Sequence, residues 1–65
     1  MKTKVIKVKW AKLPFEIKGW SEEKDGEIFV DDYRHFGVNE NGEDYDSGWM
    51  GPGLFFLSEI TEGWE

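Results

Sequence analysis

The chain has no cysteine, one histidine and only two prolines among its 65 residues. Without cysteine it can form neither a disulfide nor a thiolate metal site, and His35 alone cannot build a zinc site. No apolar run approaches the length of a signal-peptide core or a membrane span, so we expect no membrane segment. The missing cysteines fit a reducing compartment, and we expect a cytoplasmic protein that binds neither a metal nor a cofactor.

Catalytic patterns are equally scarce in this sequence. None of its three serines lies in the G-x-S-x-G elbow of a hydrolase. His35, Asp46 and Ser47 could form a triad only if the fold brought them together, and a domain this small has little room for a pocket. The glycine-rich stretch 48–53 lacks the lysine of a phosphate loop, and segment 37–48 places a glycine at the first ligand position of a calcium loop. We therefore predict a protein that is not an enzyme and has no catalytic residues.

Aromatic side chains, in contrast, are abundant. The chain has four Trp, five Phe and two Tyr, which make 17% of its residues. A domain of this size buries only about 60% of the surface that its unfolded chain exposes, and each aromatic side chain can bury roughly 150–250 Å². The composition therefore predicts one globular domain, residues 1–65, that is held together by an aromatic core.

Charge is distributed unevenly along the chain, whose net charge is −6. Residues 1–24 contain seven lysines and three glutamates, whereas residues 25–65 contain one arginine and eleven acidic residues. One interpretation is a solvated acidic surface that keeps a small protein soluble. The other is a surface that recognises a basic partner or imitates nucleic acid. We do not expect direct binding of nucleic acid, because phosphates require a cationic surface.

Alternating apolar and polar residues predict several short strands and no long helix. The predicted strands cover residues 4–10, 15–20, 27–30, 33–39, 44–46 and 54–60. Gly19 marks a bulge or a bend in the second of them. Asn41-Gly42 predicts a tight hairpin with these two residues at its centre, because both tolerate positive φ. Five to six short strands predict an all-β fold, either a small barrel or a strongly curved antiparallel sheet.

The densest apolar run, residues 54–57, follows a bend at residues 48–53 that contains a proline. We expect this run to be a central strand whose even-numbered residues, Leu54 and Phe56, face the core. Trp49 should then fold back over the other face, because four exposed apolar residues in a row would invite aggregation. The aromatic residues that fit inward positions best are Trp10, Phe15, Phe36 and Phe56.

The second half of the chain carries a family resemblance. Its segments Phe36-Gly37-Val38, Asn41-Gly42 and Phe56-Leu57-Ser58-Glu59-Ile60 are similar to the closing strands of small SH3-like proteins that phages and other mobile elements encode. The resemblance covers residues 33–62, and it implies a small SH3-like barrel and the role of a phage or mobile-element accessory factor. Peptide-binding SH3 domains also have an Ala-Leu-Tyr-Asp-Tyr-type start and paired groove tryptophans. Neither is matched here, so binding of proline-rich peptides is not implied.

Several aromatic residues fall in turns, in outward positions or near the C-terminus. The candidate partner-binding residues are Trp20, Tyr45, Trp49 and Trp64, together with the acidic Asp44 and Asp46. They could cap the ends of a barrel, or they could form an interaction patch, because Trp and Tyr dominate binding hot spots. A patch of this kind suits a protein partner with a basic or apolar surface. The leading hypothesis is a small acidic module for protein–protein interaction; the alternative is a DNA mimic that inhibits a nucleic-acid-handling enzyme.

Overall fold

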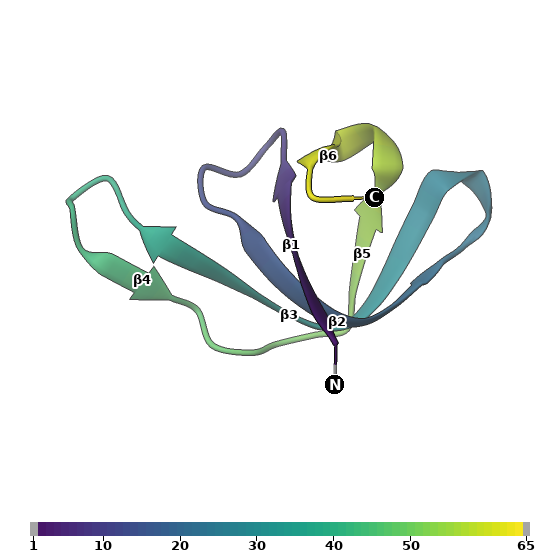
Figure 1. Ribbon diagram of the computed structural model, residues 1–65, viewed down its shortest axis with the longest axis horizontal. Helices are drawn as coiled ribbons and strands as arrows, with labels where there is room; N and C mark the ends of the chain where they lie inside the picture. Colours follow the sequence, from purple (N-terminus) through teal and green to yellow (C-terminus); the bar gives the residue numbers. More distant parts are fainter. Residues whose placement is uncertain (1, 65) are drawn as a thin grey trace.

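The chain forms one antiparallel sheet of six short strands in the computed structural model, which describes residues 2–64 (Figure 1). The elements are β1 (Thr3–Val8), β2 (Phe15–Glu22), the 3₁₀ turn η1 (Lys24–Gly26), β3 (Glu27–Val38), β4 (Asp44–Asp46), β5 (Gly53–Phe56), the 3₁₀ turn η2 (Leu57–Glu59) and β6 (Ile60–Glu62). No α-helix occurs in this part of the chain, and the all-β prediction is confirmed.

The sheet is strongly curved but open. Its strand order is β4-β3-β2-β1-β6, and β5 pairs with the first residues of β3, along the same edge as β4. β5 and β6 are therefore at opposite ends of the pairing order, although only the three residues of η2 separate them. Three residues span at most about 10 Å, so the sheet must curl until its two ends approach each other. Within residues 2–64 no ladder joins β5 to β6, and of the two predicted forms the structure has the curved sheet, not the closed barrel.

β3 is one continuous strand where the sequence predicted two. The pair Asp31-Asp32, which appeared to separate them, lies inside β3. Before this pair, Ile28 and Val30 are fully buried; after it, the ring of Tyr33 contacts the buried ring of Phe15. The residues of β3 that face the core are therefore even-numbered before the two aspartates and odd-numbered after them. This change of phase interrupts the alternating pattern without interrupting the strand.

In β2, the residues that face the core also shift by one position, opposite the same point of β3. Ile17 is buried and Trp20 packs against the core, so three positions instead of two separate these inward residues. Gly19 lies between them with a φ of +67°, and a Cβ atom here would be 2.5 Å from Oδ2 of Asp31. Gly19 is therefore the predicted bend: its positive φ favours glycine, and the side chain of Asp31 fills the space that a Cβ atom would take.

Within residues 2–64, the core consists of seven buried apolar side chains from four strands. They are Ile6, Val8, Phe15, Ile17, Ile28, Val30 and Phe55. Of the four aromatic residues that were predicted to face inward, only Phe15 is buried. Trp10 is 61% exposed, because β1 ends at Val8 and Trp10 already belongs to the following turn. Phe36 is half-buried and contacts Arg34 on the face opposite to the core.

The structure of β5 differs from the predictions for the apolar run at residues 54–57. Among the described strands it pairs with β3 alone and is an edge strand. Its inward residue is Phe55, whereas Leu54 and Phe56 are 48% and 43% exposed. Phe55 lies opposite the fully buried Ile28, and directly opposed residues point to the same face of a sheet. The prediction of Leu54 and Phe56 as core residues was wrong because a run of four apolar residues has no alternation that would fix its phase.

The β3–β4 hairpin is where the sequence predicted it, but its turn is shifted by one residue. The amide N of Gly42 donates to the carbonyl O of Asn39 over 3.0 Å, so Glu40 and Asn41 are the central residues. Gly42 follows with a φ of +78°, and the N–H of Asn39 donates to the O of Glu43 over 2.9 Å. This is a three-residue loop closed by a left-handed glycine. The backbone N–H groups of Asn41 and Glu43 both donate to Oδ1 of Asn39, and these two hydrogen bonds stabilise the three-residue loop.

Candidate functional site

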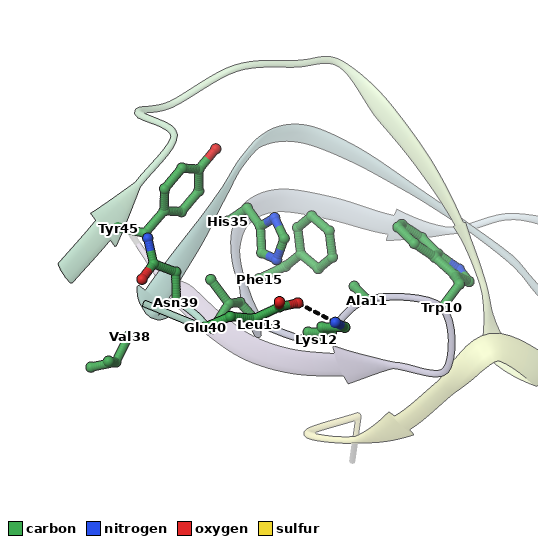
Figure 2. Close-up of a pocket in the computed structure, with 10 residues that line it drawn as sticks. All are labelled: Trp10, Ala11, Lys12, Leu13, Phe15, His35, Val38, Asn39, Glu40 and Tyr45. Atoms are coloured by element: carbon green, nitrogen blue, oxygen red, sulfur yellow. Dashed lines mark hydrogen bonds and ion pairs between the residues drawn. The ribbon is translucent and has the colours of Figure 1, made fainter. Parts of the chain in front are cut away.

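A groove of about 580 Å³ lies between the β1–β2 loop and the β3–β4 hairpin (Figure 2). The residues that line it are Trp10, Ala11, Lys12, Leu13, Phe15, His35, Val38, Asn39, Glu40 and Tyr45. Most of them are apolar or aromatic, with a few polar groups among them, which is the usual composition of a ligand site. This groove, called the aromatic groove below, is the candidate functional site.

A stack of rings forms the floor of the aromatic groove. Phe15 of β2 lies directly opposite His35 of β3, and their rings stack with centroids 4.6 Å apart and planes 13° from parallel. Tyr45 of β4 meets the edge of the His35 ring at 5.9 Å, and Trp10 contacts Phe15 at 5.6 Å. Figure 2 shows Tyr45 on one side of the stack and Trp10 on the other. Three paired strands therefore hold the floor rigidly in place.

Trp10 is the most exposed large apolar residue in the part of the chain that the structure describes. It stands just after the end of β1, where the amide N of Ala11 bonds to the O of Val8 at 3.4 Å. The loop that follows returns to β3 through a hydrogen bond from the N of Phe36 to the O of Pro14. An indole that is exposed on an anchored loop is a typical contact residue in a binding surface.

An ion pair connects the two walls of the aromatic groove. Nζ of Lys12, on the β1–β2 loop, binds Oε1 of Glu40, on the β3–β4 hairpin. Both side chains are largely exposed, so the pair contributes at most about 1 kcal/mol to stability. It links two loops that are far apart in the sequence.

The ring of His35 brings a buried polar atom into the aromatic groove. Its Nε2 is buried and has no hydrogen-bond partner within residues 2–64. Its backbone N–H donates to Oγ of Ser47 over 2.9 Å, and that hydroxyl donates to the O of Gly48. The carboxylate of Asp46 binds Arg34 instead of the imidazole. His35, Asp46 and Ser47 are therefore close in the fold but do not form the hydrogen-bonded chain of a catalytic triad.

Two of the predicted binding residues, Trp20 and Trp64, lie together and away from the aromatic groove. Their rings meet at an angle of 70° with centroids 6.1 Å apart. Nζ of Lys4 lies 4.2 Å from the Trp64 ring and 5.4 Å from the Trp20 ring. Both indoles are half-buried and pack against the core. The pair thus attaches the last described residue to β1 and β2.

Trp49 occupies a third place, on the face of the sheet opposite to the core. Nζ of Lys18 lies 4.2 Å from its ring, and the guanidinium carbon of Arg34 lies 5.4 Å from it. Arg34 in turn binds Oε1 of Glu16 at 2.6 Å and Oδ2 of Asp46 at 2.5 Å. The side chains of β2, β3 and β4 are connected here by charge and by ring contacts. Trp49 therefore does not cover β5 as the sequence predicted.

This ion-pair cluster changes the pKa values of its members. The hydrogen bond from Arg34 lowers the pKa of Glu16 below its ordinary value, and a weaker bond from Thr3 acts in the same direction. The bond to Glu16 likewise raises the pKa of Arg34. Glu16 therefore stays ionised to a lower pH than an isolated glutamate would, and the ion pair holds the centre of β2 to β3.

The structure does not bring the six predicted binding residues together. Asp44, Tyr45 and Asp46 line one cleft beside Arg34, and Tyr45 also lines the aromatic groove. Trp20 pairs with Trp64, and Asp46 joins the cluster of Trp49. The groove residues that the sequence analysis missed as a site are Trp10, Phe15 and His35. The available signal was Pro14, which breaks the strand pattern just after Trp10 and marks the start of an exposed loop.

Residues 2–64 contain neither a metal-binding cluster nor a helix that could span a membrane. No group of three or more His, Cys, Asp or Glu side chains in this range is arranged to hold a metal ion. None of its helical segments has the length and apolar character that crossing a bilayer requires. No protein-family model, curated protein or solved structure matches the chain, so its function has to be inferred from its own residues.

Proposed function

We propose that this protein is a non-enzymatic binding module that receives an apolar segment of a protein partner in the aromatic groove. The observation that carries the proposal is the position of Trp10, which is 61% exposed and lies beside the stacked rings of Phe15 and His35. An exposed indole next to a preformed aromatic floor is the arrangement that supplies most of the energy of many protein interfaces.

Rigidity supports this role. Phe15 and His35 are directly paired across two strands and their rings stack, so the floor of the groove is part of the sheet. A preformed groove loses little conformational entropy on binding, so more of the contact energy is available as affinity.

The chemistry of the partner follows from the residues that line the groove. The ring stack suits an aliphatic or aromatic side chain, and the net charge of −6 favours a partner that carries basic groups beside it. We place the module in the cytoplasm, which fits a chain without cysteine.

Selection from a displayed library of random peptides tests the proposal, because it does not require the partner to be identified. Peptides selected on the wild-type protein should contain apolar anchors beside basic residues. Trp10→Ala and Tyr45→Ala should each weaken their binding by about 2 kcal/mol, or roughly thirtyfold in Kd. Trp49→Ala is the matched control, because Trp49 is also an exposed tryptophan, as exposed as Tyr45, but lies outside the groove.

The outcomes of this selection decide the proposal, provided that circular dichroism confirms the fold of each variant. It is refuted if no peptide is enriched, or if Trp49→Ala abolishes binding while Trp10→Ala does not.

DNA mimicry is the second candidate function, and the eleven acidic residues of segment 25–65 favour it. A mimic would bind a DNA-processing enzyme through its carboxylates, so duplex DNA should compete and rising salt should weaken the complex steeply. Trp10→Ala would leave that binding unchanged. The same variant therefore distinguishes the two candidates.

A further inference from the structure

β5 leaves one edge of the sheet without a partner strand. It pairs with β3 on one side only, and the described chain places no strand along its other side. The pairing with β3 extends to Met50, which exchanges two backbone hydrogen bonds with Tyr33. Pro52 has no N–H donor, so the stretch that can accept a further strand is Gly53–Phe56.

Apolar surface lies on both sides of this free edge. On the face away from the core, Phe29, Leu54 and Phe56 are 39%, 48% and 43% exposed, and Phe29 lies directly opposite Leu54. Beside the inward residue Phe55 there is a cleft of about 260 Å³. Its lining residues are Trp10, Phe15, Tyr33, Met50, Gly53, Leu54 and Phe55. Successive side chains of a strand point to opposite faces, so an added strand would meet apolar surface with both sets of side chains.

The charges around this surface are mainly negative. Glu27 lies opposite Phe56, and Asp31 follows Phe29 on the same face of β3. Segment 22–32, which contains the turn before β3 and the part of β3 that pairs with β5, has six acidic residues and only one lysine. A strand that carries lysine or arginine beside its apolar residues would complement this field.

We propose that the free edge of β5 binds an extended, apolar and basic segment of a partner protein, which adds a strand to the sheet. Backbone hydrogen bonds to Gly53–Phe56 would supply affinity, and the cleft and the face of Leu54 would select alternate side chains. A second copy of this chain fits poorly, because pairing β5 with β5 would bring two acidic segments and two net charges of −6 together. This surface goes beyond the aromatic groove, although Trp10 lines both.

Hydrogen exchange with a synthetic probe tests the proposal. The probe is a capped peptide with a central run of valines flanked by lysines, and its control is the peptide with glutamate in place of lysine. At a probe concentration of about 100 times Kd, amides of β5 that bond to the added strand should exchange about 100-fold more slowly. The glutamate peptide should not bind. Leu54→Lys should abolish protection, because it adds a positive charge and removes apolar surface at the edge.

Val5→Lys is the matched control for that variant. Val5 is a similarly exposed apolar residue on β1, and the change in charge is identical. It should leave probe binding and exchange unaltered.

Four results would overturn the proposal. They are absence of binding, equal binding of the glutamate peptide, loss of binding in both lysine variants, and a Trp10 indole shift without protection of β5. Light scattering adds a fifth, since a dimer with protected β5 amides in the absence of probe would show that a second copy occupies the edge. A failure here leaves the groove proposal intact, because that proposal depends on Trp10 and Tyr45 and not on Leu54.

Discussion

Truncation of Phe55 tests the packing of the sheet most sharply. Phe55 is 4% exposed, and its ring contacts Phe15 at 5.4 Å and Tyr33 at 5.6 Å. Removal of a buried phenylalanine ring costs about 3–5 kcal/mol. A domain of this length has a total unfolding free energy of about 3–10 kcal/mol. Phe55→Ala should therefore remove a large part of the stability of the fold, or all of it.

Phe56→Ala is the matched control, one residue along the same strand. Its ring is 43% exposed on the other face, so its removal should cost about 1 kcal/mol. Urea unfolding followed by tryptophan fluorescence measures both variants, with the slope compared to confirm that the same surface unfolds. If Phe56→Ala is as destabilising as Phe55→Ala, the phase of β5 is not the one described, and the exposed face on which the strand-addition proposal depends does not exist.

Three further changes test local features. Gly42→Val should lower the unfolding free energy by about 1 kcal/mol or more, because φ is +78° there; an unchanged melting temperature would place the turn elsewhere. Gly51→Ala should be much more destabilising than Gly48→Ala in urea, because its Cβ would overlap a carbonyl oxygen of β3 whereas Gly48 has open space; equal effects would contradict that close approach. The pKa of Glu16 is lowered by Arg34 in the folded state, so the stability from this pair is fully present above the unfolded pKa of about 4.3 and is lost as the pH falls through the lower folded pKa. Glu16→Gln should flatten this part of the pH profile of unfolding, and an identical acid limb in the variant would show that the pair contributes nothing.

The sequence predicted the strands well wherever polar and apolar residues alternate. Phe15 and Ile17 are both buried as their spacing indicated, and β4 covers the predicted residues 44–46. The predictions failed where polar and apolar residues do not alternate. They also failed where the inward-facing positions of two paired strands, β2 and β3, shift by one residue at the same point. The four apolar residues 54–57 leave the inward position open, and only the pairing of Phe55 with Ile28 decides it.

The aromatic groove could not be predicted from local patterns. Its two walls come from residues 10–15 and 35–45, which no short-range signal connects. Trp10 continues the alternation of β1 and therefore looked like a core residue. β1 ends at Val8, where it pairs with Ile60 of β6, a residue from the other end of the sequence. Aromatic content predicted an interaction surface, but only the fold shows which of the four tryptophans stands beside a groove.

The indole N–H signals of the four tryptophans provide the most direct test, because the fold gives them three different environments. The measurement is a titration of ¹⁵N-labelled protein with a peptide selected on the wild-type chain. We predict that the Trp10 signal moves in proportion to binding, while the signals of Trp49 and of the Trp20–Trp64 pair stay in place. A Trp10 signal that does not move while the Trp49 or the Trp64 signal does would contradict the aromatic groove as the binding site.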